Sequence, residues 1–345
     1  MAKPLPTLED VAQLAGFSPA TVSRCLNAPH KLSHKTRQKI ESAITTLGYV
    51  PNALGRGLAS HQSNIVGALI PSLSNAMFAN GVQAFQETLA AQNLALILAT
   101  TGYDLEEEAR QARNLVSQGA SGLLLIGKAQ HGRTLEFLAS RHIPYVLSWC
   151  FDRHSPHPHV GFNNQTAARI AAEHVVGYGH RHIGLICGLS ADNDRAQDRQ
   201  AGYRQAVAAA GGQTRISHCL EAPYSLESGR LALQELMATA PETTAVLCGN
   251  DVLAAGAMMA AREQGLQVPK DVSIVGFDDI GLAAVLSPAL TTVRVPQTEM
   301  GRLAAEALIR LRHDASATAS VELNTDFILR GTLAAPRPPN ISGPT

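Results

Sequence analysis

The sequence lacks long apolar runs and has few aromatic residues, 4% of 345 residues, and few charged ones, 16%. Hydrophobic residues make up 45%, which excludes a disordered chain and favours a soluble α/β protein. No run approaches the roughly 18 apolar residues of a membrane helix, and the N-terminus lacks the apolar core of a signal peptide. We therefore expect a cytoplasmic protein without a membrane partner.

Paired cysteines and the common enzyme motifs are also missing. The five cysteines are isolated and form no CxxC motif, which excludes a disulfide framework and a zinc knuckle. The motifs GxGxxG, GxxxxGK[ST] and GxSxG do not occur. His154, His157 and His159 alternate with prolines, and we interpret this segment as a solvated loop rather than a metal site. The sequence predicts no catalytic residue, metal or cofactor.

The net charge of zero conceals an uneven distribution along the chain. Residues 1–62 hold seven cations and three anions, a net charge of +4, and the remainder therefore carries −4. Four of the six lysines lie within the first 39 residues. A short basic module on an acidic body is typical of a protein that binds a polyanion through one part and has another role in the other.

The basic module has the signals of a helix-turn-helix. Thr7 caps a first helix that ends at Gly16, and Ser18 caps a second helix whose first residue is Pro19. A third helix follows within residues 33–48 and closes a small core. The second helix of this motif enters the major groove of DNA, and the alternative is a plain three-helix bundle.

The segments TLEDVAQLAGFSPATVSRCLN and KLSHKTRQKIESAITTLGYVPN resemble the headpiece of the lactose-repressor/galactose-repressor family of bacterial transcription regulators. The resemblance implies that Pro19 and Ala20 select bases, and that the segment after the headpiece is a hinge whose Leu58 wedges into the minor groove. The candidate DNA-binding residues are Thr7, Ser18, Pro19, Ala20, Thr21, Ser23, Arg24, Asn27, Asn52 and Leu58.

The body alternates short apolar runs with amphipathic stretches, which predicts parallel strands covered by helices on both faces. The expected strands are Ile65–Pro71, Ala95–Thr100, Gly122–Ile126, Tyr145–Ser148, Ile183–Cys187, Ala245–Cys248 and Ser273–Gly276. The resemblance continues in PSLSNAMFA, GHRHIG, CGNDVLAAGAM and VSIVGFDD. It implies an α/β fold in which two lobes of doubly wound parallel sheets close on an effector, as in periplasmic sugar-binding proteins.

The expected domains follow from these patterns. They are a headpiece, residues 1–49; a hinge, 50–62; an N-terminal lobe, 63–162 with 293–322; a C-terminal lobe, 163–292 with 323–335; and a disordered tail, 336–345.

Polar or aromatic residues follow most of the expected strands, at the sheet edges where open α/β sheets bind ligands. The resemblance adds weight to Arg199, Asn250 and Asp278 as effector contacts. The candidate effector-binding residues are Ser72, Asn75, Phe78, Thr101, Lys128, Trp149, Arg199, Tyr224, Asn250 and Asp278.

Together these features predict a homodimeric repressor that binds palindromic operator DNA under the allosteric control of a small carbohydrate effector. Lys128 and Arg199 are two cations near a mostly neutral polar ring, which favours a sugar acid, and SLSNAMFA, TTGYDLEEE and HGRTLEF resemble the gluconate-utilisation branch. A neutral sugar or a nucleoside stays open, as does the sign of regulation. The alternative function is a solute-binding protein or sugar-metabolising enzyme with a helical assembly module.

Overall fold

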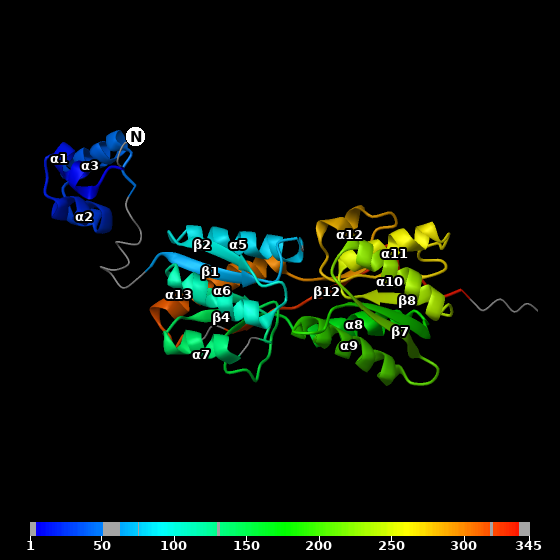
Figure 1. Ribbon diagram of the computed structural model, residues 1–345. Coiled ribbons are helices and arrows are strands. Elements are labelled where there is room, and N and C mark those ends of the chain that lie inside the picture. The colour runs from blue at the N-terminus through cyan, green and yellow to red at the C-terminus, as the bar shows by residue number, and fades with distance from the viewer. Residues whose placement is uncertain (1–4, 51–62, 75, 130–131, 318–319, 338–345) are drawn as a thin grey trace, which may run out of the picture. The chain divides into compact units, whose positions relative to one another are not determined.

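The computed structural model describes residues 5–50, 63–74, 76–129, 132–317 and 320–337. Its contacts divide the chain into two units, Met1–Ser63 and Asn64–Thr345. Figure 1 shows a helical first unit and an α/β second unit. None of the described helices is long and apolar enough to cross a membrane.

The first unit is a helix-turn-helix, as predicted. Its helices are α1 (Leu8–Ala15), α2 (Pro19–Asn27) and α3 (His34–Leu47), with the 3-10 turn η1 (Pro29–Lys31) between the last two. Thr7 and Asp10 form a reciprocal capping box, and Gly16 ends α1 in the left-handed conformation at φ 72°. The small core consists of Val11, Ala12, Val22, Cys25, Ile40 and Ala43.

The first lobe of the second unit is built on a six-stranded parallel sheet in the order β11-β5-β4-β3-β1-β2. The strands are β1 (Ile65–Ile70), β2 (Ala95–Thr100), β3 (Ala120–Ile126), β4 (Tyr145–Ser148), β5 (His159–Gly161) and β11 (Val321–Glu322). The helical elements are η2 (Ala76–Phe78), α5 (Ala79–Ala90), α6 (Leu105–Ser117), α7 (Gly132–Ser140) and α13 (Gln297–His313).

Helices cover both faces of this sheet (Figure 1). On one face α5 packs against α13, although more than 200 residues separate them in the chain. Glycine makes this close approach possible, because a Cβ on Gly301 would lie 1.9 Å from the carbonyl oxygen of Gly81. On the other face α6 and α7 bury Leu115 and Leu138 against Leu123 and Leu147.

The second lobe has a four-stranded parallel sheet in the order β7-β6-β8-β9. Its strands are β6 (His182–Gly188), β7 (Arg215–Ala222), β8 (Ala245–Cys248) and β9 (Ser273–Val275). Its helices are α8 (Asn164–Gly177), α9 (Asp194–Ala210), α10 (Leu226–Thr239), α11 (Asp251–Glu263) and α12 (Gly281–Val285). Alternating strand residues face opposite ways, so Leu185 packs with α8 and α9 while Ile186 packs with α10 and α11.

A short antiparallel pair, β10 (Thr292–Arg294) with β12 (Asp326–Ile328), lies where the chain passes between the lobes. The end of the described chain rests on the second lobe, where His180 bonds to the carbonyl oxygen of Ala334 and Arg337 pairs with Asp271 at 2.6 Å. Residues 338–345 lie outside the described residues.

The seven expected strands are present, with ends that differ by up to two residues. The expectation for the histidine-rich segment was wrong at His159, which lies in β5 with 1% of its surface exposed. Pairing of β5 with β4 and β11 overrides the local proline signal there. Among the described residues no group of three or more His, Cys, Asp or Glu side chains is arranged to hold a metal ion.

Candidate functional site: an exposed helix turn and an interlobe cleft

The first turn of α2 is the exposed part of the headpiece at which the sequence predicts base contacts. Ser18 caps this helix, and its hydroxyl lies 2.9 Å from the Thr21 hydroxyl. Pro19, Ala20 and Arg24 are exposed, whereas the inner face of α2 is buried in the headpiece core. A capped helix with a bare first turn and an exposed cation, Arg24, in its last turn has the shape and charge that fit a DNA groove.

The other predicted DNA contacts differ in what the structure describes. Thr7 is exposed at the start of α1, and Ser23 is half-buried on α2. Asn27 ends α2, but its side chain is not described. Asn52 and Leu58 lie outside the described residues.

The predicted effector contacts mostly follow strand ends on the edges of the two sheets. In the first lobe, Ser72 follows β1, Thr101 follows β2, Lys128 follows β3 and Trp149 follows β4. In the second lobe the corresponding residues after β7, β8 and β9 are Tyr224, Asn250 and Asp278. Arg199 lies on α9, and Asn75 lies outside the described residues.

Arg199 is the centre of a buried polar network in the second lobe. It is 2% exposed, and its guanidinium donates to Asn164 Oδ1 at 2.9 Å, to the Gly249 carbonyl at 2.7 Å and to Asp278 Oδ1 at 3.3 Å. Its charge also lies 3.8 Å from the ring centroid of Phe277. Burial raises the pKa of Asp278 to about 6 even though Arg199 opposes that shift.

Asn164 extends this network across the cleft. Its amide donates to the backbone oxygen of Trp149 in the first lobe at 2.9 Å while its side-chain oxygen accepts from Arg199. One amide side chain therefore links the two lobes by hydrogen bonds.

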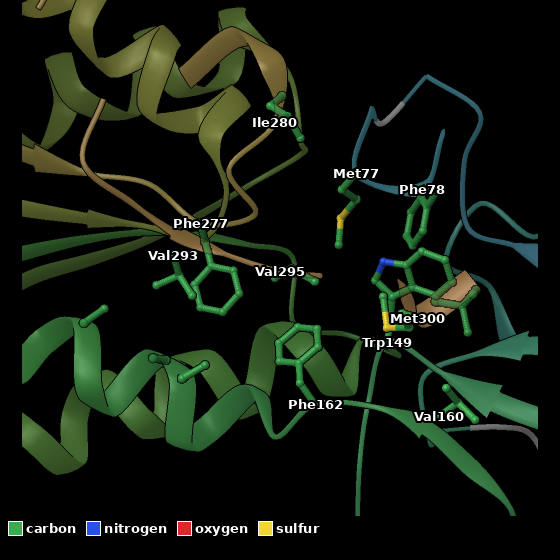
Figure 2. Packing of buried hydrophobic residues seen from close by; sticks show 14 of the residues in the cluster. Met77, Phe78, Trp149, Val160, Phe162, Phe277, Ile280, Val293, Val295 and Met300 are labelled. Atoms are coloured by element: carbon green, nitrogen blue, oxygen red, sulfur yellow. The ribbon is translucent and has the colours of Figure 1, made fainter. Parts of the chain in front are cut away.

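Trp149 and Phe78 form an aromatic wall on the first-lobe side (Figure 2). Their ring centroids lie 5.4 Å apart at an interplanar angle of 62°, and both side chains are almost fully buried. The indole Nε1 of Trp149 has no hydrogen-bond partner among the described residues. In Figure 2 this nitrogen lies on the side of the ring toward Met77.

Lys128 does not present a free cation to the cleft. Its ammonium pairs with Asp198 of the second lobe at 2.8 Å, and its backbone N–H donates to Asp194 Oδ2 at 2.9 Å. Because Asp278 pairs with Arg199, the two cations are both matched by acids. The expectation of two cations in a mostly neutral ring was therefore wrong, since the acids that face them come from distant parts of the chain.

Two tyrosines from opposite lobes meet beside a cavity. Tyr103 follows Thr101 and lies 6.0 Å from Tyr224, measured between ring centroids. Burial raises the pKa of Tyr224 to about 12, so its hydroxyl stays protonated. The cavity has a volume of about 550 Å³ and is lined by Pro71, Ser72, Leu73, Ser74, Thr100, Gly102, Tyr103 and Tyr224.

Asn250 has a structural role as well as its place at the strand end. Its side-chain oxygen caps α11 by accepting from Leu253 N at 2.9 Å. The next residue, Asp251, accepts from Ile280 N and from Thr292 Oγ1, and burial raises its pKa to about 8. This acid joins α11 to β10, the strand between the lobes.

Known protein families match both the helical first unit and the α/β body of this chain. Residues 7–52 match the bacterial regulatory proteins of the lacI family, and residues 172–333 match a periplasmic binding protein-like domain. The ribose operon repressor of Haemophilus influenzae is 32% identical over 88% of this chain and 91% of its own length. The regulator GntR of Escherichia coli K12 is 35% identical over 90% of this chain and 92% of its own. The chain belongs to the lacI family of bacterial regulatory proteins.

Solved structures of the lacI family have the same fold. A regulator from Silicibacter pomeroyi superposes with a TM-score of 0.87 at 28% identity, over 95% of this chain and 99% of its own. The lac repressor dimer bound to operator and the anti-inducer ONPF gives 0.85 at 29% identity, over 96% and 100%. This lacI-family chain is therefore a DNA-binding transcriptional repressor and not an enzyme.

Several charged residues near the strand-end edges of the two sheets in this lacI-family chain were not predicted from the sequence as site candidates. Asp194, Arg195 and Asp198 come from the first turns of α9, and Glu108 comes from the first turn of α6. The sequence did contain a signal that could have indicated these residues. Each of the two helices follows a predicted strand, so its first turns lie at the edge of a sheet that faces the cleft.

Proposed function

We propose that this repressor binds palindromic operator DNA as a homodimer, and that a carbohydrate held between its two lobes controls the affinity. The observation that carries this proposal is the exposed, capped first turn of α2 joined in one chain to a two-lobed body with charged contacts across its cleft. One helix-turn-helix reads one half-site, so a twofold pair suits a palindrome. Operator DNA lies in the bacterial cytoplasm, which is where we propose that the protein acts.

On the DNA side we propose distinct roles for the α2 residues. Pro19 and Ala20 are small and apolar, which suits contact with a thymine methyl group, and Arg24 supplies a cation for phosphate. The remaining proposed contacts are Thr7, Ser18, Thr21, Ser23, Asn27, Asn52 and Leu58.

On the effector side we propose that the cleft residues bind a polyhydroxylated molecule. A related structure, 29% identical with a TM-score of 0.70, is described as a CelR-cellobiose complex, and another relative is named for the ribose operon. The aromatic wall of Trp149 and Phe78 suits the apolar face of a sugar, and the buried amide and acid groups suit its hydroxyls. The full set of proposed contacts is Ser72, Asn75, Phe78, Thr101, Lys128, Trp149, Arg199, Tyr224, Asn250 and Asp278.

A sugar acid such as gluconate stays our first candidate effector because of the resemblance to the gluconate-utilisation branch. The ion pairs of Lys128 and Arg199 weigh against it, since a carboxylate would have to compete with Asp198 and Asp278 for those cations. Calorimetric titration with gluconate and with ribose decides between them. Heat from ribose and none from gluconate would exclude the sugar acid.

Operator binding is tested by selecting bound sites from random DNA with and without gluconate, ribose and cellobiose. We expect a palindrome to be enriched and one sugar to change the yield. Arg24→Ala should weaken binding of the selected site about tenfold and lower the slope of log K against log salt by about 1, if Arg24 binds phosphate. Arg302→Ala, which removes an exposed side chain of α13, is the matched control. Equal binding to all sequences would reject the proposal.

A further inference from the structure

Another cavity lies in the first lobe, at the sheet edge opposite the cleft. It has a volume of about 500 Å³ and lies between the end of α7, the start of β4 and the end of α13. Tyr145, the first residue of β4, lines this cavity, whereas Trp149 follows the other end of the same strand, at the cleft. The volume is within the range of small-molecule sites, roughly 300–1,000 Å³. The cavity is therefore large enough for a small ligand and is separate from the proposed effector site.

Much of the cavity wall is apolar and is fixed by the packing of the lobe. Leu138 belongs to the buried cluster on the α6 and α7 face of the sheet, and Ile143 packs against that cluster. Leu311 packs against the cluster on the α13 face, and Pro144 completes the apolar wall between them. Close-packed side chains keep their positions, so this wall is preformed.

The charged groups of the cavity are basic. They are His142, Arg312 and His313, and among the described lining residues none is an Asp or a Glu. The neighbouring acid Asp314 already accepts from the backbone N–H and the hydroxyl of Ser316, at 2.9 and 2.6 Å. Burial lowers the pKa of Arg312, and an anion in the cavity would stabilise its charged form. The charge of the cavity is therefore complementary to an anion.

His142 occupies a backbone position that glycine usually takes. It follows α7 with φ 54°, and its N–H donates to the Ala139 carbonyl while the next N–H donates to the Leu138 carbonyl. The same motif follows α5 with Asn93 at φ 57°, and follows α11 with Gly265 at φ 74°. Glycine would be less strained than histidine at this position. A contact between the imidazole and a ligand in the cavity accounts for a histidine there.

We propose that this cavity binds a small carboxylate that has an apolar body. The carboxylate group contacts His142, Arg312 and His313, and the body lies against the apolar wall. A purely local role for the cations makes a different prediction. Arg312 and His313 are in the last turn of α13, where positive charge stabilises a helix, so in that case they would contribute to stability and not to binding.

Three probes test the two halves of the site separately: phenylacetate, the neutral phenylethanol, and acetate, which lacks the apolar body. Titration of the full chain, followed by the methyl NMR signals of Leu138, Ile143 and Leu311, measures the three dissociation constants. We expect phenylacetate to bind with millimolar affinity and about tenfold more tightly than either of the other probes.

Three results of this titration would overturn the proposal. Equal binding of phenylethanol would show that the cavity does not select an anion. Equal binding of acetate would show an adventitious ion only. No change of the three methyl signals with phenylacetate would show that the cavity binds no such ligand.

His142→Gly is a variant that should keep the fold. Because glycine is less strained in this motif, the variant should be at least as stable as the wild type. It should nevertheless bind phenylacetate about tenfold more weakly, because it loses a charge-assisted hydrogen bond. Asn93→Gly, in the same motif after α5, is the matched control and should bind phenylacetate as the wild type does.

Arg312→Gln should also weaken the binding of phenylacetate, by about tenfold. Arg310→Gln is its control, because Arg310 is exposed on the same helix and lies outside the lining of the cavity. Lower stability of Arg312→Gln with unchanged binding would assign the cation to the helix end and overturn the site. If Arg312→Gln did not fold, unchanged binding by His142→Gly would still overturn it.

Discussion

The headpiece and the cleft differ in whether their cationic side chains are exposed or buried. Lys31, Lys35 and Lys39 are exposed on the headpiece, whereas Arg195 and Arg199 of the body are buried and paired with acids. Exposed cations are available to an external polyanion, while buried ones are already committed to internal partners. Charge in the headpiece is therefore suited to binding DNA, and charge in the cleft to fixing the arrangement of two lobes.

The two regions also differ in what stabilises them. The headpiece has a small core, and its helices rely on local caps at Thr7, Ser18 and Ser33. The body has extensive cores on both faces of each sheet and carries buried polar groups that would be unstable without that packing. Substitutions should therefore affect the two units by different mechanisms and by different amounts.

The largest effect should come from Arg199→Met, which leaves Asp278 buried without its cation. Removing one partner of a buried ion pair costs about 3–5 kcal/mol. The midpoint temperature at which the body unfolds should therefore fall sharply. The headpiece should be unaffected, since its core contains none of these residues. Thermal unfolding can be followed by circular dichroism and by the NMR signals of headpiece protons. Together these two measurements distinguish unfolding of the body from unfolding of the headpiece.

The control for this experiment is Arg302→Met, which removes an exposed pair with Glu306 on α13 and should change stability by less than about 1 kcal/mol. Equal losses of stability in the two variants would show that the burial of Arg199 does not determine how much its ion pair stabilises the body.

A smaller effect should appear as the pH changes. The pKa of Asp251 is raised to about 8 in the folded body, above its ordinary value of 3.8, so the folded state binds more protons than the unfolded state between these values. The free energy of unfolding of the body should then fall by about 1–2 kcal/mol from pH 6.5 to pH 8. Urea unfolding at several pH values measures the slope.

Asp251→Asn should flatten this slope whatever it does to stability at a single pH. The headpiece acid Asp10 behaves in the opposite sense, because hydrogen bonds from Thr7 lower its pKa, and its contribution is lost only as the pH falls through the acid range. A slope that persists in Asp251→Asn would assign the effect to other groups, among them Glu108.

The difference between the locally capped headpiece and the body, which depends on long-range packing, also explains which features the sequence could predict. The caps at Thr7 and Ser18 and the ends at Gly16 and Gly48 are local signals, and all four have the predicted role. Continuous apolar runs such as Gly122–Ile126 also identified the inner strands. β7 was missed because RISHCLEA, an edge strand, mixes polar and apolar residues.

The cleft was only partly predictable because its chemistry depends on pairing over long distances. The strand ends indicated Lys128 and Asp278 as site candidates, but nothing in the spacing joins Lys128 to Asp198, 70 residues away. Likewise the sequence does not distinguish Glu108 from the two acids that precede it in the first turn of α6, although only Glu108 is buried in the fold. Tertiary packing, rather than local propensity, determines which charges are matched.

The smallest effect tests the local side of the comparison. Ser33 caps α3 by accepting from Thr36 N at 3.2 Å, so Ser33→Ala should destabilise the headpiece by about 1 kcal/mol and leave the body unchanged. Ser42→Ala, in the exposed middle of the same helix, should be neutral or stabilising by a few tenths of a kcal/mol, because alanine favours helix interiors. Amide hydrogen exchange of the two units measures both. If Ser33→Ala also loosened the body, the two units would share one cooperative transition, and local caps would contribute to the stability of the whole chain.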